Sequence, residues 1–330
     1  MKQEEPILVA IHCLVYNHEP YLRDCFEGFV MQKTNFRFVA VVHEDASTDN
    51  SAVIIREYEA KYPDIFRPIY ETENQWHKTD GSLGRIMNAA INATGAKYVA
   101  MCEGDDYWTD PYKLQKQVDF LEEHEEFSLC CHGYSILNVD KGTMVEKRVV
   151  LPPESKDGLM FTNAENMMEW YTKTPTVLMR ADVYKAVPDL SIFKYACDTY
   201  IFYYILKQGK GYYLSFNGAV YRAHGGGVYS SLSSFKKDLN CVKIFYEIYT
   251  HNREDDVLEQ QLLDTIKWVS DEIIWNLKDK EWTLDVFEGI SLINTILYKE
   301  KKYKDLFAWH KKLAISQFKR VKRKFKKYIV

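Results

Sequence analysis

Three carboxylates within four residues directly follow an apolar run in the first third of the sequence. The run Lys97-Tyr98-Val99-Ala100-Met101 leads into Cys102-Glu103-Gly104-Asp105-Asp106-Tyr107-Trp108. Like charges this close raise one another's pKa unless a cation lies among them. Carboxylate oxygens at the end of a rigid strand suit a hard divalent ion that also binds phosphate oxygens. The segment therefore predicts a metal site for a phosphorylated ligand.

Two other predicted strands also end in polar residues. Ile7–Val15 is followed by Tyr16-Asn17-His18-Glu19, and Phe36–Val42 by His43-Glu44-Asp45. Strand-like and helix-like segments alternate through the first 140 residues, which predicts an α/β fold with a mostly parallel sheet covered on both faces. Ligands bind beyond the carboxyl ends of the strands in such sheets, so the three polar clusters should meet at one edge. This convergence is stronger evidence for a site than any single motif.

The remaining elements follow from periodicity and from turn residues. Helices are expected over Leu22–Met31, Ser51–Tyr62 with Ser47 or Thr48 as N-cap, Leu83–Asn92, from Asp110-Pro111 onward, and Asp198–Leu206. Further strands are expected over Phe66–Tyr70, Tyr98–Cys102, Phe127–Leu137, Thr176–Met179, Gly211–Leu214 and Ala219–Arg222. Residues 140–160 are interpreted as a connecting loop, and helical periodicity dominates from about Ser231.

Composition excludes several classes of protein. The seven cysteines form no Cys-x-x-Cys pair, which argues against a disulfide framework or a zinc cage and favours a reducing compartment. The N-terminus shows no signal peptide, and no uncharged apolar run approaches the roughly 18 residues of a spanning helix. The sequence therefore indicates a cytoplasmic protein whose length allows one large domain or two modest ones.

Charge is distributed unevenly. Residues 301–330 contain 12 Lys or Arg and one acid, a balance of +11, whereas the other 300 residues have a balance of −15. In the last thirteen residues (318–330, the basic tail), apolar side chains recur near helical spacing between the bases. One face could enter a membrane interface while the bases meet anionic lipid. A disordered solubilising end and nucleic-acid binding are the alternatives, although no nucleic-acid partner is expected.

Phosphate-binding loops of the common nucleotide folds are absent from the sequence. There is no Gly-x-Gly-x-x-Gly after the first strand and no Lys-Ser/Thr loop, so the dinucleotide and P-loop classes lose their main support. Over roughly residues 5–230 the chain instead resembles family 2 glycosyltransferases of the GT-A fold, of the bacterial polysaccharide type. The resemblance rests on the order and spacing of three segments: 11–19, 42–49 and 103–108.

The resemblance implies a role for each polar cluster. Glu103-Gly104-Asp105 stands at the family's Asp-x-Asp position, with Glu in place of the first Asp. Asp105 would bind Mn²⁺ or Mg²⁺ together with His224, which precedes three glycines. The nucleotide-binding residues implied are Tyr16, Asn17, Glu19, Asp45, Lys78, Arg85, Glu103 and Gly104. The structural alternatives are a turn or helix-cap acid for Asp45, a solvated helix face for Arg85 and an ordinary core histidine for His224.

Asp198 is the expected catalytic base. It stands in Ala196-Cys197-Asp198-Thr199-Tyr200, which resembles the family's late acidic motif with Cys197 in place of the first acid. A helix N-cap is the alternative. Asp106 is placed on the acceptor side or behind the metal ligands. Trp108 is placed on the acceptor side, where the indole would stack on a sugar unless it belongs to the core.

Together these expectations describe an inverting, metal-dependent glycosyltransferase. Its donor would be a nucleotide-diphosphate sugar, with UDP as the expected nucleotide, and its acceptor a hydroxyl of a glycan or lipid-linked saccharide. Residues 1–235 would form the GT-A domain and residues 236–330 a helical region whose tail contacts the inner face of a membrane. The alternatives are a nucleotide-sugar-binding module without turnover and a nucleotidyltransferase.

Overall fold

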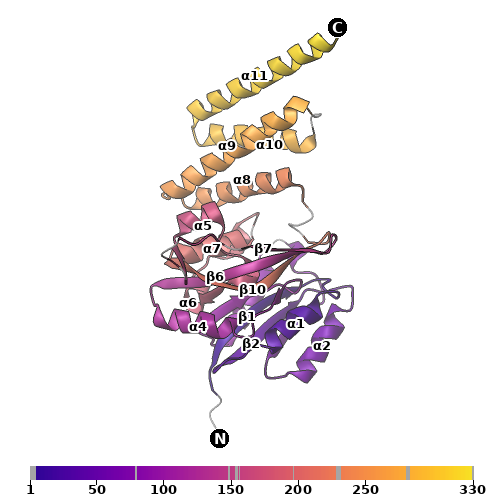
Figure 1. Cartoon of the computed structure of the whole chain (residues 1–330), viewed down its shortest axis with the longest axis vertical. Helices are drawn as coiled ribbons and strands as arrows, with labels where there is room; N and C mark the ends of the chain where they lie inside the picture. The colour runs from indigo at the N-terminus through magenta and orange to yellow at the C-terminus, as the bar shows by residue number, and fades with distance from the viewer. Residues whose placement is uncertain are drawn as a thin grey trace. The chain divides into compact units, whose positions relative to one another are not determined.

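The computed structural model describes residues 5–328 except positions 79, 148, 153–154, 156, 196, 228–231 and 280–282. The side chains of 276, 278–279 and 318–328 also lie outside the described part. The chain divides into two compact units, Met1–Gly227 and Val228–Val330. The first unit contains the sheet and the second is helical (Figure 1).

The first half of the sheet is parallel and places the polar clusters at one edge. Its strand order is β3-β2-β1-β4. The bounds are Ile7–Val15 for β1, Arg37–Glu44 for β2, Phe66–Tyr70 for β3 and Tyr98–Met101 for β4. β1 pairs in parallel with both β2 and β4, so the loops after these three strands leave the sheet side by side. The predicted α/β class is confirmed.

The second half of the sheet is mixed. β9 (Leu178–Arg180) runs antiparallel between β4 and β6 (Phe127–Asn138), and β10 (Lys210–Ala223) is parallel to β6. The short strand β5 (Tyr107–Trp108) pairs with β10. The two strands expected over residues 211–222 are one strand, because β10 continues through register shifts between Leu214 and Ala219.

Residues 140–160, expected as a loop, contain two further strands. β7 (Thr143–Lys147) pairs with β6, and β8 (Gly158–Phe161) pairs with β10. All five β7 side chains are exposed. The strand is therefore held by main-chain hydrogen bonds to β6 and buries no apolar face that periodicity could reveal.

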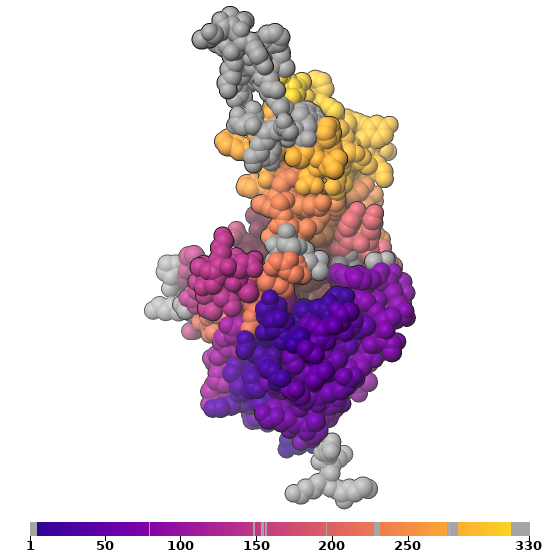
Figure 2. Space-filling model, turned by 90° about the vertical axis from the view of Figure 1, so that its right-hand side faces the viewer, coloured from indigo at the N-terminus to yellow at the C-terminus, as the bar shows by residue number. Residues whose placement is uncertain are grey.

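Helices cover both faces of the sheet, and strand side chains alternate between two cores. Val9, Ile11 and Cys13 pack with the helices α1, α2 and α4, whereas Ala10 packs with α3, α6 and α7. The bounds are Leu22–Val30 (α1), Ser51–Lys61 (α2), Ser82–Ala93 (α3), Lys113–Glu123 (α4), Asn163–Glu169 (α5), Ala181–Lys185 (α6) and Asp198–Leu206 (α7). Figure 2 shows the indigo-to-violet N-terminal segments as one continuous surface of this unit.

The described part of the second unit folds into four helices. They are α8 (Ser234–His251), α9 (Asp256–Asp279), α10 (Leu284–Lys299) and α11 (Tyr303–Tyr328). A buried stripe at helical spacing holds α9 in the bundle: Leu258, Leu262, Ile266, Val269, Ile273 and Leu277. Among the described residues, no helix has the length and apolar character needed to cross a membrane. The tail's side chains lie outside the described residues, although α11 extends to Tyr328.

Helix α1 approaches the sheet closely at Gly28. A Cβ there would lie 2.9 Å from the backbone nitrogen of Trp108 and 3.2 Å from its oxygen. The neighbour is backbone in a paired strand and cannot turn aside as a flexible side chain would. Gly84 on α3 has open space around the corresponding position.

We expect Gly28→Ala to lower the free energy of unfolding by about 1–3 kcal/mol, because the added methyl group forces α1 away from β5. Gly84→Ala should instead be neutral or add about 0.4–1 kcal/mol, since alanine restricts the unfolded chain and meets no obstacle. Urea unfolding of the full chain measures both changes. Equal stability of the two variants would contradict this account of α1 packing.

Candidate active site

The loops after β1 and β2 are fastened to each other by hydrogen bonds. The backbone N–H of Asn17 donates to Ser47 Oγ at 3.0 Å, and the Asn17 side-chain oxygen accepts from the Thr48 N–H at 2.8 Å. Glu19 accepts from the backbone and side-chain N–H groups of Asn50 at 2.9 and 2.7 Å. The two loops therefore form one unit at the carboxyl edge, and Asn17 and Glu19 already have partners within it.

Asp45 anchors the segment that follows β3. Its two carboxylate oxygens accept from the backbone N–H groups of Gln75 at 2.6 Å and Trp76 at 3.1 Å, and the residue is only 4% exposed. These bonds hold the short 3₁₀ turn Trp76–Lys78 at the end of β2. Each oxygen keeps one lone pair for a further donor. The 38% exposed Tyr16 lies beside this turn, with its ring 6.1 Å from that of His77.

The two basic residues expected to face the nucleotide have local acidic partners. Lys78 Nζ lies 2.5 Å from Glu73 Oε1. Arg85 on α3 donates to the backbone oxygen of Asp80 at 2.9 Å and lies 3.5 Å from Asp189. Arg85 is half exposed, and no hydrogen bond within the described ranges joins it to the loops after β1, β2 or β4.

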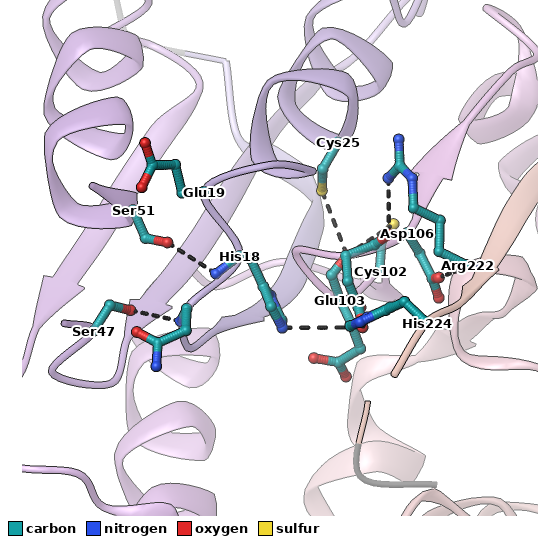
Figure 3. A network of polar contacts seen from close by, with 12 residues as sticks. His18, Glu19, Cys25, Ser47, Ser51, Cys102, Glu103, Asp106, Arg222 and His224 are labelled. Atoms are coloured by element: carbon teal, nitrogen blue, oxygen red, sulfur yellow. Dashed lines mark hydrogen bonds and ion pairs between the residues drawn. The ribbon is translucent and has the colours of Figure 1, made fainter. Parts of the chain in front are cut away.

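The turn between β4 and β5 brings a carboxylate and two imidazoles together. His224 Nε2 lies 3.1 Å and His18 Nε2 3.9 Å from the same atom, Asp105 Oδ2. Gly104 makes room for this arrangement, because a Cβ there would stand 2.7 Å from His18 Nδ1 and 2.9 Å from Val15 Cγ2. In Figure 3, His18 and His224 extend toward each other from opposite sides of the turn. The sequence pattern predicted Asp105 and His224 here but gave no role to His18.

Electrostatics at this turn are dominated by crowded acids. Burial, followed by the charges of Asp105, Asp106 and Asp198, holds the pKa of Glu103 well above its usual value. Burial and the Asp105 charge likewise raise the pKa of Asp106. Burial also acts to raise the pKa of Asp105, but the His224 hydrogen bond and the charge of His18 outweigh it and lower that pKa. A cation bound here would relieve the repulsion among these groups.

Asp106 and Trp108 are inside the protein, so their placement on the acceptor side needs correction. Asp106 is 1% exposed, and its Oδ1 accepts from the backbone N–H of Arg222 at 2.8 Å. Trp108 is 2% exposed, its indole N–H donates to the Pro175 oxygen at 2.9 Å, and Lys113 Nζ lies 4.1 Å from its ring centroid. Its surface is covered by these contacts, so no sugar can stack on it.

Arg222 is a structural link that the sequence pattern did not reveal. Its guanidinium donates to the backbone oxygen of Asp105 at 2.8 Å and to the Asp24 carboxylate on α1. It also lies 4.3 Å from the ring centroid of Tyr107 and is 5% exposed. One buried side chain on β10 thus joins α1 to the turn that carries Asp105.

Asp198 begins α7 and belongs to the same electrostatic neighbourhood. Its Oδ2 accepts from the Thr174 hydroxyl at 3.3 Å. Its charge contributes to the raised pKa of Glu103. Burial, followed by the charges of Asp106, Asp105 and Asp198, raises the pKa of Tyr221. The neighbouring Lys173 places Nζ 3.9 Å from the Tyr221 ring centroid. The segment 173–174 was not singled out by the sequence.

The donor set at Asp105 fits a divalent ion. A carboxylate oxygen and an imidazole nitrogen 3.1 Å apart are both ordinary ligands of such ions, and the ion's remaining positions would be open to phosphate oxygens and water. Among the described residues, no three His, Cys, Asp or Glu side chains already form a metal-binding group.

Comparison with known proteins identifies a family for the chain. The sequence model for "Glycosyl transferase family 2" matches residues 11–186, which is more than half of the chain. The uncharacterized protein Rv1520 of Mycobacterium tuberculosis is 32% identical over 223 residues, covering 68% of this chain and 61% of Rv1520. The uncharacterized glycosyltransferase alr2836 of Nostoc sp. is 27% identical over 222 residues, 66% of each chain. The chain thus spans less than two thirds of the length of these relatives.

A solved structure shares the fold over nearly the whole chain. Residues 1–349 of TarS from S. aureus, crystallised with UDP, superpose with a TM-score of 0.54 at 17% identity, covering 93% of this chain and 90% of that one. At this identity the likeness concerns the fold. The same fragment was also crystallised with UDP-GlcNAc, with a TM-score of 0.53.

We expect Arg222→Met to lower the free energy of unfolding by about 1.5–3 kcal/mol, because charge-assisted hydrogen bonds that join α1, β10 and the Asp105 turn are lost. Asp24→Ala should lower the free energy of unfolding by less than about 1 kcal/mol, since the side chain of Asp24 is 64% exposed. Chemical denaturation of both variants measures the difference. Similar losses would show that the Asp24 ion pair, and not the bond to Asp105, carries the effect.

Proposed function

Because the chain belongs to glycosyl transferase family 2, we propose that it transfers a sugar from a nucleoside-diphosphate sugar to an acceptor hydroxyl, with inversion at the anomeric carbon. The observation that carries this proposal is the gathering of Asp105, His224 and Asp198 in one acidic neighbourhood at the carboxyl edge of a parallel sheet. Such edges are where α/β sheets bind their ligands.

The nucleoside is proposed to bind between the loops after β1 and β2. Asp45 keeps lone pairs that can accept from a base N–H or a ribose hydroxyl, and Tyr16 offers an exposed ring beside it. Asn17 and Glu19 contribute by ordering the two loops. TarS, which shares the fold, was crystallised with UDP and with UDP-GlcNAc, which favours a uridine donor.

The diphosphate is proposed to bind at the Asp105 turn together with Mn²⁺ or Mg²⁺. Asp105 and His224 would hold the ion, which supplies positive charge that neutralises the leaving diphosphate. Glu103 precedes Gly104 and Asp105 in this turn, where its carboxyl could bind a ribose hydroxyl. Gly104 keeps the turn close to His18.

Asp198 is proposed to act as the general base. It takes the proton of the acceptor hydroxyl as that oxygen attacks the anomeric carbon, while the bond from this carbon to the diphosphate oxygen breaks on the opposite side. The Thr174 hydroxyl holds Asp198 Oδ2 and so leaves Oδ1 for the acceptor. Lys173, next to Thr174, lies over the ring of Tyr221 and adds a positive charge there.

We propose residues 1–235 as the catalytic domain and 236–330 as a helical region. The basic tail at the end of this region would hold the enzyme on an anionic membrane surface, where lipid-linked saccharide acceptors are found. Its seven Lys or Arg residues over thirteen positions support this role, because each base near such a surface adds about 1 kcal/mol of attraction.

We expect Asp198→Asn to keep donor binding and to lose turnover by about 10²–10⁴-fold, since the amide cannot take a proton but still accepts from Thr174. Asp105→Ala should instead lose Mn²⁺-dependent binding of UDP. Calorimetry with UDP, with and without Mn²⁺, and Mn²⁺-dependent hydrolysis of a panel of nucleotide sugars separate the two effects.

Asp119→Asn, an exposed acid on α4, is the matched control and should behave as the unmodified chain. Unchanged turnover in Asp198→Asn would remove Asp198 from the role of base. UDP binding that is the same with and without Mn²⁺ would remove the metal from the proposal.

Removal of the basic tail should abolish flotation of the chain with phosphatidylserine vesicles, because the bases that meet the anionic surface are lost. Phosphatidylcholine vesicles are the control, and added salt should weaken the interaction of the full chain. A full chain that stays out of the vesicle fraction, or a truncated one that still floats, contradicts a membrane role for the tail.

A further inference from the structure

His18 directs the same ring nitrogen at Asp105 as His224 does. Both Nε2 atoms point to one oxygen, Asp105 Oδ2, at 3.9 and 3.1 Å. The three side chains are largely shielded from solvent, with exposed fractions of 18% for His18, 9% for His224 and 19% for Asp105. Two imidazoles and a carboxylate that converge on one point form a set of nitrogen and oxygen donors.

The fold holds the His18 ring in this position. The His18 backbone N–H donates to Ser51 Oγ at 2.9 Å, and its carbonyl accepts from the N–H groups of Tyr21 and Leu22 at the start of α1. The missing side chain of Gly104 gives the ring its space. Nδ1 is buried and has no hydrogen-bond partner among the described residues. Nε2, the other ring nitrogen, is the one that faces Asp105 Oδ2.

The measured separations match the spacing of ligand atoms around one metal ion. Nitrogen and oxygen ligands lie about 2.0–2.2 Å from ions such as Zn²⁺, and Mg²⁺ keeps similar distances. Two such ligands are then about 3.0 Å apart at a right angle and about 4.2 Å apart when opposite. The distances of 3.1 and 3.9 Å from Asp105 Oδ2 both lie in this range. No three side chains of the described ranges form a finished metal group, and binding of one ion by all three side chains would require the rings to turn.

We propose that His18 is a third protein ligand of the divalent ion, beside Asp105 and His224, and that the two imidazoles make this site prefer Mn²⁺ and later transition ions to Mg²⁺. The preference follows from chemistry, since imidazole suits transition ions whereas Mg²⁺ takes oxygen ligands and retains water. The inference rests on the proposed function for the presence of a metal, and it adds a ligand and a metal selectivity.

The test is metal binding by the full chain, measured by calorimetry with Mn²⁺ or Mg²⁺, each alone and with UDP. His18→Ala should weaken Mn²⁺ binding by about 10–100-fold and Mg²⁺ binding far less. His124→Ala, a half-exposed histidine that follows α4, is the control and should leave both affinities unchanged. Pulsed electron paramagnetic resonance of the Mn²⁺-loaded unmodified chain should show nitrogen couplings from two imidazoles.

Couplings from a single imidazole in the unmodified chain would overturn the proposal, and this measurement does not depend on any variant folding. Equal weakening of Mn²⁺ and Mg²⁺ binding in His18→Ala would also overturn it, because a residue that only positions Asp105 affects both ions alike. If Asp105→Ala and His224→Ala leave Mn²⁺ binding unchanged as well, the metal site of the proposed function fails, and not the role of His18 alone.

Discussion

The crowding of carboxylates at the end of β4 is the constraint on which this site depends. Glu103, Asp105 and Asp106 follow one another within four positions, and Asp198 adds its charge from α7. Buried acids so close together repel one another and favour proton uptake. Groups from three other residues lie against these acids: the backbone N–H and the guanidinium of Arg222, and the imidazoles of His18 and His224.

These compensating groups come from both halves of the sheet. His18 belongs to the loop after β1, whereas Arg222 and His224 lie at or after the end of β10. The acidic turn can keep its shape only if the parallel strands on one side and β10 on the other are both in place. Formation of the site is thus coupled to assembly of both halves of the sheet. At Gly104 and Gly28 the neighbouring segments pack so closely that no side chain would fit.

The loops that would bind the nucleoside follow the same principle. Asn17, Glu19 and Asp45 all accept backbone N–H donors from segments about thirty residues away. Such bonds order the loops before any ligand arrives, which lowers the entropic cost of binding. The helical unit combines apolar stripes of ordinary spacing with ion pairs between its segments, such as Lys243–Glu288 and Arg253–Glu300.

The sequence by itself determined the alternation of strands and helices, the polar clusters at three strand ends and the family resemblance. These features are visible because apolar periodicity and strand-end chemistry are local properties of the chain. Only the tertiary structure decided that Trp108 and Asp106 are buried, that β9 is inserted antiparallel between β4 and β6, and that β7 exists. It also decided that His18 meets Asp105 and that Arg222, 116 positions beyond Asp106, satisfies that acid. Contacts at such separations depend on strand order and on the space left by glycines, and neither has a periodic signature in the sequence.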